Sequence, residues 1–191
     1  MGRWEPGAGG RLREAALSLF VERGFEQTMV NDIAERAGVT ARTFFRYFAD
    51  KREVLFDASA EVEEKALAAL EAAPATASAL ELVAAALDAA ADVIGQDRGL
   101  ARKRHTVIMA NADLRERELS KLAKISAELA DALRRRGVGD AEAAIAAEAG
   151  AAVYRVAFQR WVDAEGGDLD LRGALQAGFA QLRTLAAPRA G

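Results

Sequence analysis

The chain of 191 residues has no cysteine, one histidine, three prolines and two tyrosines. Without cysteine, disulfides, thiolate metal sites and a cysteine nucleophile are excluded. A single histidine and the lack of a glycine-rich phosphate loop leave no catalytic or metal-ligating pattern. Carboxylates such as Glu63, Glu64 and Glu148 occur at helical spacing and are interpreted as surface charges. We therefore expect a protein that is not an enzyme and that has no metal site and no cofactor.

Long apolar segments are also missing. No run of about 18 apolar residues without a charge occurs, and the first ten residues contain no apolar stretch typical of a signal peptide. The absence of cysteine fits a reducing compartment. We expect a cytoplasmic protein that does not contact a membrane.

The chain also lacks an excess of positive charge. The 26 cations are outnumbered by 29 anions, which gives a net charge of −3 and a pI near 5.4. Such a balance disfavours a protein that coats nucleic acid through its overall charge, such as a non-specific architectural protein. Any contact with DNA must therefore come from a local group of cations.

Apolar residues recur at spacings of three and four along most of the chain, and strict alternation is nearly absent, which predicts an all-α fold. Glycines 24, 38 and 137 are expected to end helices. We expect about nine helices, near residues 11–23, 28–37, 40–48, 50–70, 78–94, 100–110, 113–136, 140–165 and 169–185. The expected domains are a tail at 1–10, a helix-turn-helix domain at 11–57 and a helical domain at 58–187.

The segment GVTARTFFRYFADK, which begins at Gly38, carries the functional signal. Gly38, Val39 and Thr40 separate two short helices, as in a helix-turn-helix. Phe44 and Phe48 lie one turn apart and are expected to hold the second helix against the core.

The longer string RLREAALSLFVERGFEQTMVNDIAERAGVTARTFFRYFADKREVL resembles the DNA-binding domain of the TetR family of bacterial regulators. The resemblance extends over about residues 11–56 and requires many residues in one register. Beyond it, only chain length and helical pattern match the family. The resemblance implies a ligand-responsive regulator, usually a repressor, that binds an inverted-repeat DNA operator as a homodimer.

Residues of the second short helix and its flanks are assigned roles on DNA. The expected base-reading residues are Arg42, Thr43 and Arg46. The expected phosphate contacts are Thr28, Thr40, Tyr47 and Lys51. Thr28 and Thr40 could also be simple helix caps, and Arg46 and Lys51 could be ordinary solvated charges. At Phe45 the family usually has a tyrosine whose hydroxyl touches phosphate, so we assign this phenylalanine to packing.

The dimer implied by the resemblance would be made by the eighth and ninth helices. The eighth contains the run AEAAIAAEAGAA at residues 141–152, and the ninth contains Gly173, Ala177 and Gly178. Small residues permit close approach of helices in a four-helix interface. The alternative is that the run reflects only the alanine-rich composition.

The resemblance also implies a pocket for a small, largely apolar effector. The candidate lining residues are His105, Met109, Tyr154, Phe158 and Trp161. His105 could instead face solvent, and Phe158 and Trp161 could belong to the core or the dimer interface. The C-terminal part is loosely similar to the subgroup of mycofactocin regulators, for which acyl-CoA-like ligands are expected. A basic run, Arg98, Arg102, Lys103 and Arg104, could meet a CoA phosphate or be solvated.

In such a regulator, an effector that favours one pocket shape would shift the sixth helix against the fourth and change the separation of the two DNA-binding domains. The competing interpretation is a helical small-molecule-binding protein without a DNA function.

Overall fold

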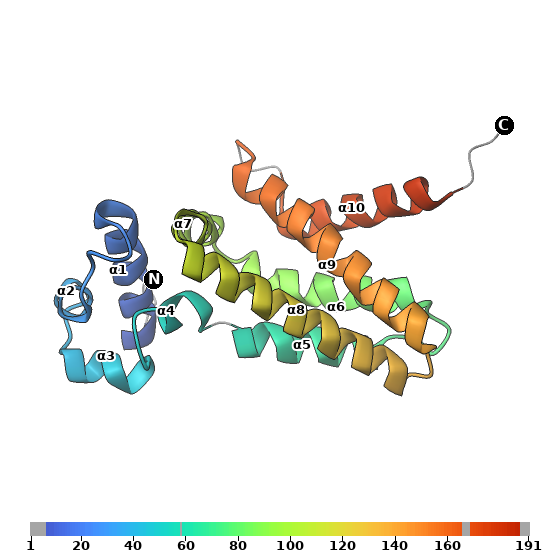
Figure 1. Ribbon diagram of the computed structural model, residues 1–191, viewed down its shortest axis with the longest axis horizontal. Coiled ribbons are helices and arrows are strands. Elements are labelled where there is room, and N and C mark those ends of the chain that lie inside the picture. Colours follow the sequence, from blue (N-terminus) through green and yellow to red (C-terminus); the bar gives the residue numbers. More distant parts are fainter. Residues whose placement is uncertain (1–6, 58, 166–168, 188–191) are drawn as a thin grey trace, which may run out of the picture. The chain divides into compact units, whose positions relative to one another are not determined.

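The computed structural model describes residues 7–57, 59–165 and 169–187, and within these ranges it contains only α-helices (Figure 1). The all-α prediction is confirmed. No helix in these ranges is both long and apolar enough to cross a bilayer. The helices are α1 (Ala8–Arg23), α2 (Val30–Arg36), α3 (Ala41–Tyr47), α4 (Glu53–Phe56), α5 (Ser59–Ala72), α6 (Ala79–Ile94), α7 (Arg98–Ala110), α8 (Ala112–Arg135), α9 (Asp140–Asp163) and α10 (Leu171–Ala186).

The chain forms two compact units. The head unit comprises the described residues up to Ser59 together with Gly99–Glu118. The body unit comprises Ala60–Arg98 and the described residues from Leu119 onward. The head unit therefore includes most of α7 and the first turns of α8, in addition to the N-terminal segment that the sequence pattern had delimited.

Helix ends follow the glycines that the sequence pattern singled out. Gly24, Gly38 and Gly137 adopt positive φ angles of 86°, 68° and 87°, a region that glycine enters without a steric penalty. The largest differences from the expected boundaries concern two helices. Helix α1 begins at Ala8 rather than near residue 11, so only residues 1–6 of the expected tail lie outside the described ranges. The single helix expected at 50–70 is divided into α4 and α5.

The core of the head unit fixes the position of α3. Its fully buried side chains include Leu12 and Leu19 of α1, Ile33 of α2 and Phe44 of α3. Ile108 of α7 joins the same cluster. Helix α3 is only seven residues long and would not be stable alone, because isolated short helices are marginal in water. Packing against α1 and α2 therefore holds it.

In the body unit, α9 packs against both α6 and α10 (Figure 1). Two glycines make this packing close. A Cβ atom at Gly150 would lie 2.3 Å from Cγ1 of Val83 in α6, and one at Gly178 would lie 2.8 Å from Cγ1 of Val153 in α9. The sequence pattern assigned these small residues to contacts between two copies of the chain. In the structure, both glycines instead face valines of the same chain.

Arg136 closes the end of α5. Its Nη1 donates to the carbonyls of Leu70 and Glu71, both at 2.8 Å, and its Nη2 donates to those of Ala73 and Pro74, both at 2.9 Å. Carbonyls at a helix C-terminus lack partners within the helix and carry a partial negative charge. The guanidinium satisfies them with a matching positive charge.

Candidate nucleic-acid interface

Helices α2 and α3 form the helix-turn-helix. Helix α2 ends at the cap residue Ala37, Gly38 makes the turn, and the amide of Val39 donates to the carbonyl of Ala34 at 2.9 Å. Thr40 has extended backbone angles, and its Oγ1 accepts from the amide of Thr43 at 3.2 Å. The prediction that Thr40 caps α3 is confirmed, since such a bond satisfies one of the free amides of the first turn.

The inner face of α3 is aromatic, as predicted. Phe44 is completely buried and Phe48 nearly so, and their ring centroids are 5.4 Å apart. These two rings fix which side of the helix is turned outward.

The outer face of α3 carries Arg42, Phe45 and Arg46. Residues three and four apart are neighbours on a helix surface, so the three side chains form one exposed group. Thr43 is half-buried, and its hydroxyl lies 3.1 Å from that of Thr40. The assignment of Phe45 to packing holds only in part, because its ring contacts that of Phe44 but 58% of its surface is exposed.

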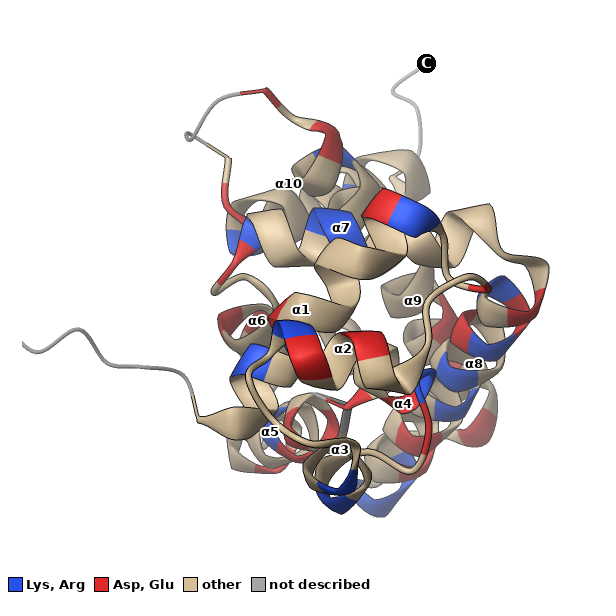
Figure 2. Ribbon diagram, turned by 90° about the vertical axis from the view of Figure 1, so that its left-hand side faces the viewer, with Lys and Arg blue, Asp and Glu red and all other residues tan. Residues whose placement is uncertain are grey.

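Arg23 of α1 and Arg36 of α2 are paired with carboxylates, in contrast to the arginines of α3. Arg36 forms two hydrogen bonds with the Glu22 carboxylate, at 3.1 and 3.0 Å, and Arg23 lies 3.9 Å from Asp32. The hydrogen bonds from Arg36 lower the pKa of Glu22. Neither arginine of α3 has an ion pair with any residue that the structure describes. Figure 2 shows acidic and basic segments together on α1 and α2 but basic segments alone on α3.

Tyr47 lies at the edge of the exposed group, where α3 meets the start of α1. A Cβ atom at Gly9 would be 3.2 Å from its ring, so the absence of a side chain there leaves room for the tyrosine. The Arg46 guanidinium lies 5.1 Å from the ring centroid, and its Nη2 is 3.5 Å from the hydroxyl oxygen. The hydroxyl remains on an exposed side chain, as a phosphate contact requires.

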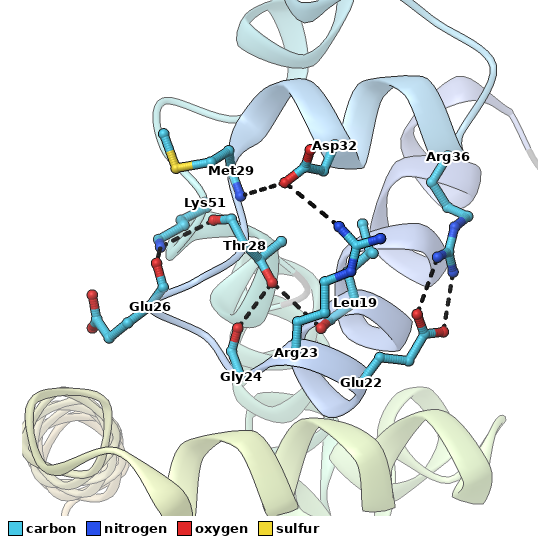
Figure 3. A network of polar contacts seen from close by, with 10 residues as sticks. All are labelled: Leu19, Glu22, Arg23, Gly24, Glu26, Thr28, Met29, Asp32, Arg36 and Lys51. Atoms are coloured by element: carbon cyan, nitrogen blue, oxygen red, sulfur yellow. Dashed lines mark hydrogen bonds and ion pairs between the residues drawn. The ribbon is translucent and has the colours of Figure 1, made fainter.

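Thr28 lies in the loop between α1 and α2 and not at the cap position of α2. It is completely buried, and the single hydrogen of its hydroxyl is shared between the carbonyls of Gly24, at 2.9 Å, and Leu19, at 3.3 Å (Figure 3). The cap residue of α2 is Met29, whose amide donates to the carboxylate of Asp32 at 3.0 Å. The prediction that Thr28 caps α2 is therefore wrong, and a buried hydroxyl does not fit a phosphate contact. Thr28 instead holds the loop after α1 against that helix.

Lys51 contacts the same loop. Its Nζ donates to the carbonyls of Phe25 at 2.7 Å, Glu26 at 3.2 Å and Thr28 at 3.1 Å, and lies 4.5 Å from the centroid of the Phe25 ring. An ammonium has three hydrogens to donate, and these three carbonyls are enough to accept all of them. Figure 3 shows the lysine reaching the loop from the segment that follows α3. We call the carbonyls of Phe25, Glu26 and Thr28, with the Lys51 ammonium, the lysine brace.

A second contact that the sequence pattern did not indicate joins α4 to α7 and α8 within the head unit. Guanidinium carbons of Arg104 and Arg117 lie 5.4 and 4.6 Å from the centroid of the Phe56 ring. Arg104 donates to the Leu55 carbonyl and forms a bidentate pair with Glu118. Because these residues are distant in the chain, no local periodicity could have revealed the contact. It also occupies the Arg104 guanidinium, which the sequence pattern had left open for a CoA phosphate.

Arg117 completes this arrangement by pairing with Glu53, also of α4. We call Phe56 with Arg104 and Arg117 the α4 clamp.

The predicted effector-pocket residues fall in two groups. Tyr154, Phe158 and Trp161 form an aromatic row along α9, with successive ring centroids 5.7 and 5.8 Å apart. Phe158 and Trp161 are buried, whereas Tyr154 is half-buried. His105 and Met109 lie on the part of α7 that belongs to the head unit, where Met109 is 43% exposed.

A cleft of about 250 Å³ lies between α1 and the end of α2. It is lined by Arg11, Glu14, Ala15, Ser18, Arg36 and Ala37. Three of its six lining residues are charged, unlike the apolar walls expected for the effector pocket.

Comparison with known proteins identifies both parts of the chain. Residues 12–58 match the family model for bacterial regulatory proteins of the tetR family, and residues 77–187 match the model for the MftR C-terminal domain. The HTH-type transcriptional regulator TcmR of Streptomyces glaucescens is 42% identical over 88 residues, which are 46% of this chain and 38% of that protein. The match thus spans well under half of that regulator's length.

Two solved structures show the same fold. The fatty acid degradation regulator FadR of Bacillus halodurans has a TM-score of 0.65 and 18% identity, with 99% of this chain and 100% of that one covered. The Thermus thermophilus repressor FadR, in complex with lauroyl-CoA, has a TM-score of 0.57 and 24% identity, with 96% and 97% covered. The matched regions, 12–58 and 77–187, take in most of the chain, and the chain belongs to the TetR family of bacterial regulatory proteins.

Proposed function

We propose that this chain is an effector-responsive transcriptional regulator, acting as a repressor, that binds an inverted-repeat operator as a homodimer. The observation that carries the proposal is the outer face of α3. There, Arg42 and Arg46 are exposed on a helix held by Phe44, and no described carboxylate pairs with them. A recognition helix needs this combination of a fixed inner face and exposed donors on the outer face.

Base reading is assigned to Arg42, Thr43 and Arg46, and phosphate contact to Thr40 and Tyr47. An arginine that donates two hydrogen bonds to guanine discriminates between bases by about 1–3 kcal/mol. The net charge of the protein is −3, so attraction to DNA depends on this local face. Binding should therefore weaken as salt rises, in proportion to the number of phosphates neutralised.

The homodimer is assigned to α9 and α10. On α9, Ile145 and Val156 are 70% and 56% exposed, and Ala149 and Ala152 lie between them at spacings of four, three and four. Apolar residues at this period form one stripe along a helix, as in a helix-to-helix contact. Pairing of two copies would present two α3 helices to successive major grooves, about 34–36 Å apart.

For the effector we propose an apolar molecule of the acyl-CoA class. Support comes from the match of residues 77–187 to the MftR C-terminal domain and from the shared fold with a repressor in complex with lauroyl-CoA. The α4 clamp offers a route for the response. It ties α7 and α8 to α4 of the same head unit, so a shift of α7 would be transmitted to α4. Only an effector with different affinities for the two states would release DNA.

The proposal is tested by selecting duplexes from a random pool with the purified full-length protein and measuring binding by fluorescence anisotropy. Wild type should enrich an inverted repeat, and Arg46→Ala should lose about 5- to 150-fold of the discrimination at one base pair per half-site. Arg135→Ala, which removes an exposed arginine of the body unit, is the matched control and should bind like wild type.

Enrichment of no duplex would contradict the proposal. If lauroyl-CoA nevertheless raised the melting temperature, a small-molecule-binding protein without a DNA function would be the better description. Unchanged base discrimination in Arg46→Ala would remove Arg46 from the reading face.

A further inference from the structure

Phe45 occupies the centre of the outer face of α3. It lies three residues after Arg42 and directly before Arg46, and it is 58% exposed. Single exposed apolar side chains are common on proteins and by themselves need no explanation. This one, however, stands between the two arginines that the proposed function assigns to base reading, so it must enter the groove with them.

The ring of Phe45 is also held in place. Its centroid is 5.5 Å from that of Phe44, and the two planes meet at 85°, an edge-to-face contact. Phe44 is completely buried, and edge-to-face pairs are stabilising beyond the area they bury. The orientation of the exposed ring is therefore supported from the core.

A phenylalanine ring has no hydrogen-bond donor or acceptor, so it cannot bond to a phosphate oxygen or to a polar base edge. In the major groove the principal apolar feature of the base pairs is the C5-methyl group of thymine. Contact with this methyl group is the interaction that removes the apolar surface of both partners from water.

We propose that Phe45 is a specificity-determining residue that recognises a thymine methyl group in each half-site, next to the base pairs contacted by Arg42 and Arg46. The inference rests on the proposed function, and it adds an apolar contact to the polar ones. It predicts half-sites in which a thymine neighbours a guanine, because an arginine bonds to guanine on the same helix face.

The test uses the duplex selected by the full-length protein. Each thymine of the half-sites is replaced in turn by deoxyuridine, which lacks only the methyl group. For wild type, one position should lose about fourfold in affinity per half-site, which corresponds to about 0.8 kcal/mol for one buried methylene-sized group. For Phe45→Ala, the same replacement should cause no loss.

Phe45→Gln, which keeps bulk and helix propensity, should show the same insensitivity to deoxyuridine as Phe45→Ala. Val21→Ala is the matched control, since it truncates an exposed apolar side chain of α1 and should keep the wild-type sensitivity. An equal loss in wild type and both Phe45 variants, or no loss at any thymine, overturns the inference while leaving the regulator intact. Failure to enrich any duplex overturns the proposed function and this inference with it.

Discussion

Replacing Lys51 with methionine distinguishes a structural role of this lysine from the phosphate contact expected from the sequence. The change removes three donors from the carbonyls of Phe25, Glu26 and Thr28, at 2.7, 3.2 and 3.1 Å. A hydrogen bond from a charged donor contributes about 1.5–3 kcal/mol, and the contact of an exposed cation with a ring about 0.5–1 kcal/mol. These contributions are not additive, since one ammonium makes all of them. We expect the free energy of unfolding to fall by about 2–3 kcal/mol, and the melting temperature by about 5–10 °C.

The assay is thermal unfolding followed by circular dichroism, together with hydrogen exchange of the amides in the loop at residues 24–29. Lys65→Met is the matched control, because Lys65 pairs with Glu61 four residues away on an exposed helix surface, and such pairs contribute about 0.3–0.5 kcal/mol. If Lys51→Met melted like wild type while the salt dependence of DNA binding fell by about two charges per dimer, the lysine brace would be refuted as the role of Lys51.

Two further predictions concern the body unit. Gly150→Ala should lower the free energy of unfolding by about 1–3 kcal/mol, because the new methyl group would lie 2.3 Å from Cγ1 of Val83. A urea-denaturation cycle with Val83→Ala should show coupling between the two sites, and simple additivity would contradict a direct contact. Burial and then the hydrogen bond with Glu128 raise the pKa of Glu63 above its ordinary 4.5. The folded state thus holds this proton more tightly than the unfolded chain, so stability falls as pH rises from 4.5 through the raised value. Glu63→Gln should reduce the change of stability with pH in this range, and the variant should be more stable than wild type at pH 7. A less stable variant at pH 7 would show that the ion pair with Lys124 stabilises the Glu63 carboxylate by more than burial destabilises it.

Much of the fold was predictable because its signals are local. Gly24, Gly38 and Gly137 end helices for a reason contained in one residue, namely that glycine tolerates a positive φ. The aromatic inner face of α3 follows from the spacing of Phe44 and Phe48, and both are buried as predicted.

The features that sequence reasoning missed concern residues whose surroundings come from elsewhere in the chain. Thr28 is a residue type that often caps helices and stands just before α2. Its hydroxyl, however, contacts the carbonyls of Leu19 in α1 and Gly24 at the end of that helix. Phe45 was assigned to packing because it lacks the hydroxyl with which the family's usual tyrosine touches phosphate, yet 58% of its surface is exposed. For Lys51 the phosphate contact stays a prediction, while its bonds to carbonyls far back in the chain are a placement that no local pattern contains.

The proposed dimer interface and effector pocket were harder to predict for the same reason. Small residues indicate close packing but not the partner, and Gly150 and Gly178 turn out to face Val83 and Val153 of the same chain. For these sites the sequence limits the choice of helices, while the contacts depend on the folded arrangement.

The four bonds that Arg136 donates at the end of α5 all go to main-chain oxygens. Every residue type supplies the same carbonyl, so the segment from Leu70 to Pro74 is free to change its side chains during evolution as long as its backbone path is kept. An inserted or deleted residue would move the carbonyls out of reach of the guanidinium. Related chains that retain this arginine should therefore vary in the identity of the residues at this corner and seldom in their number.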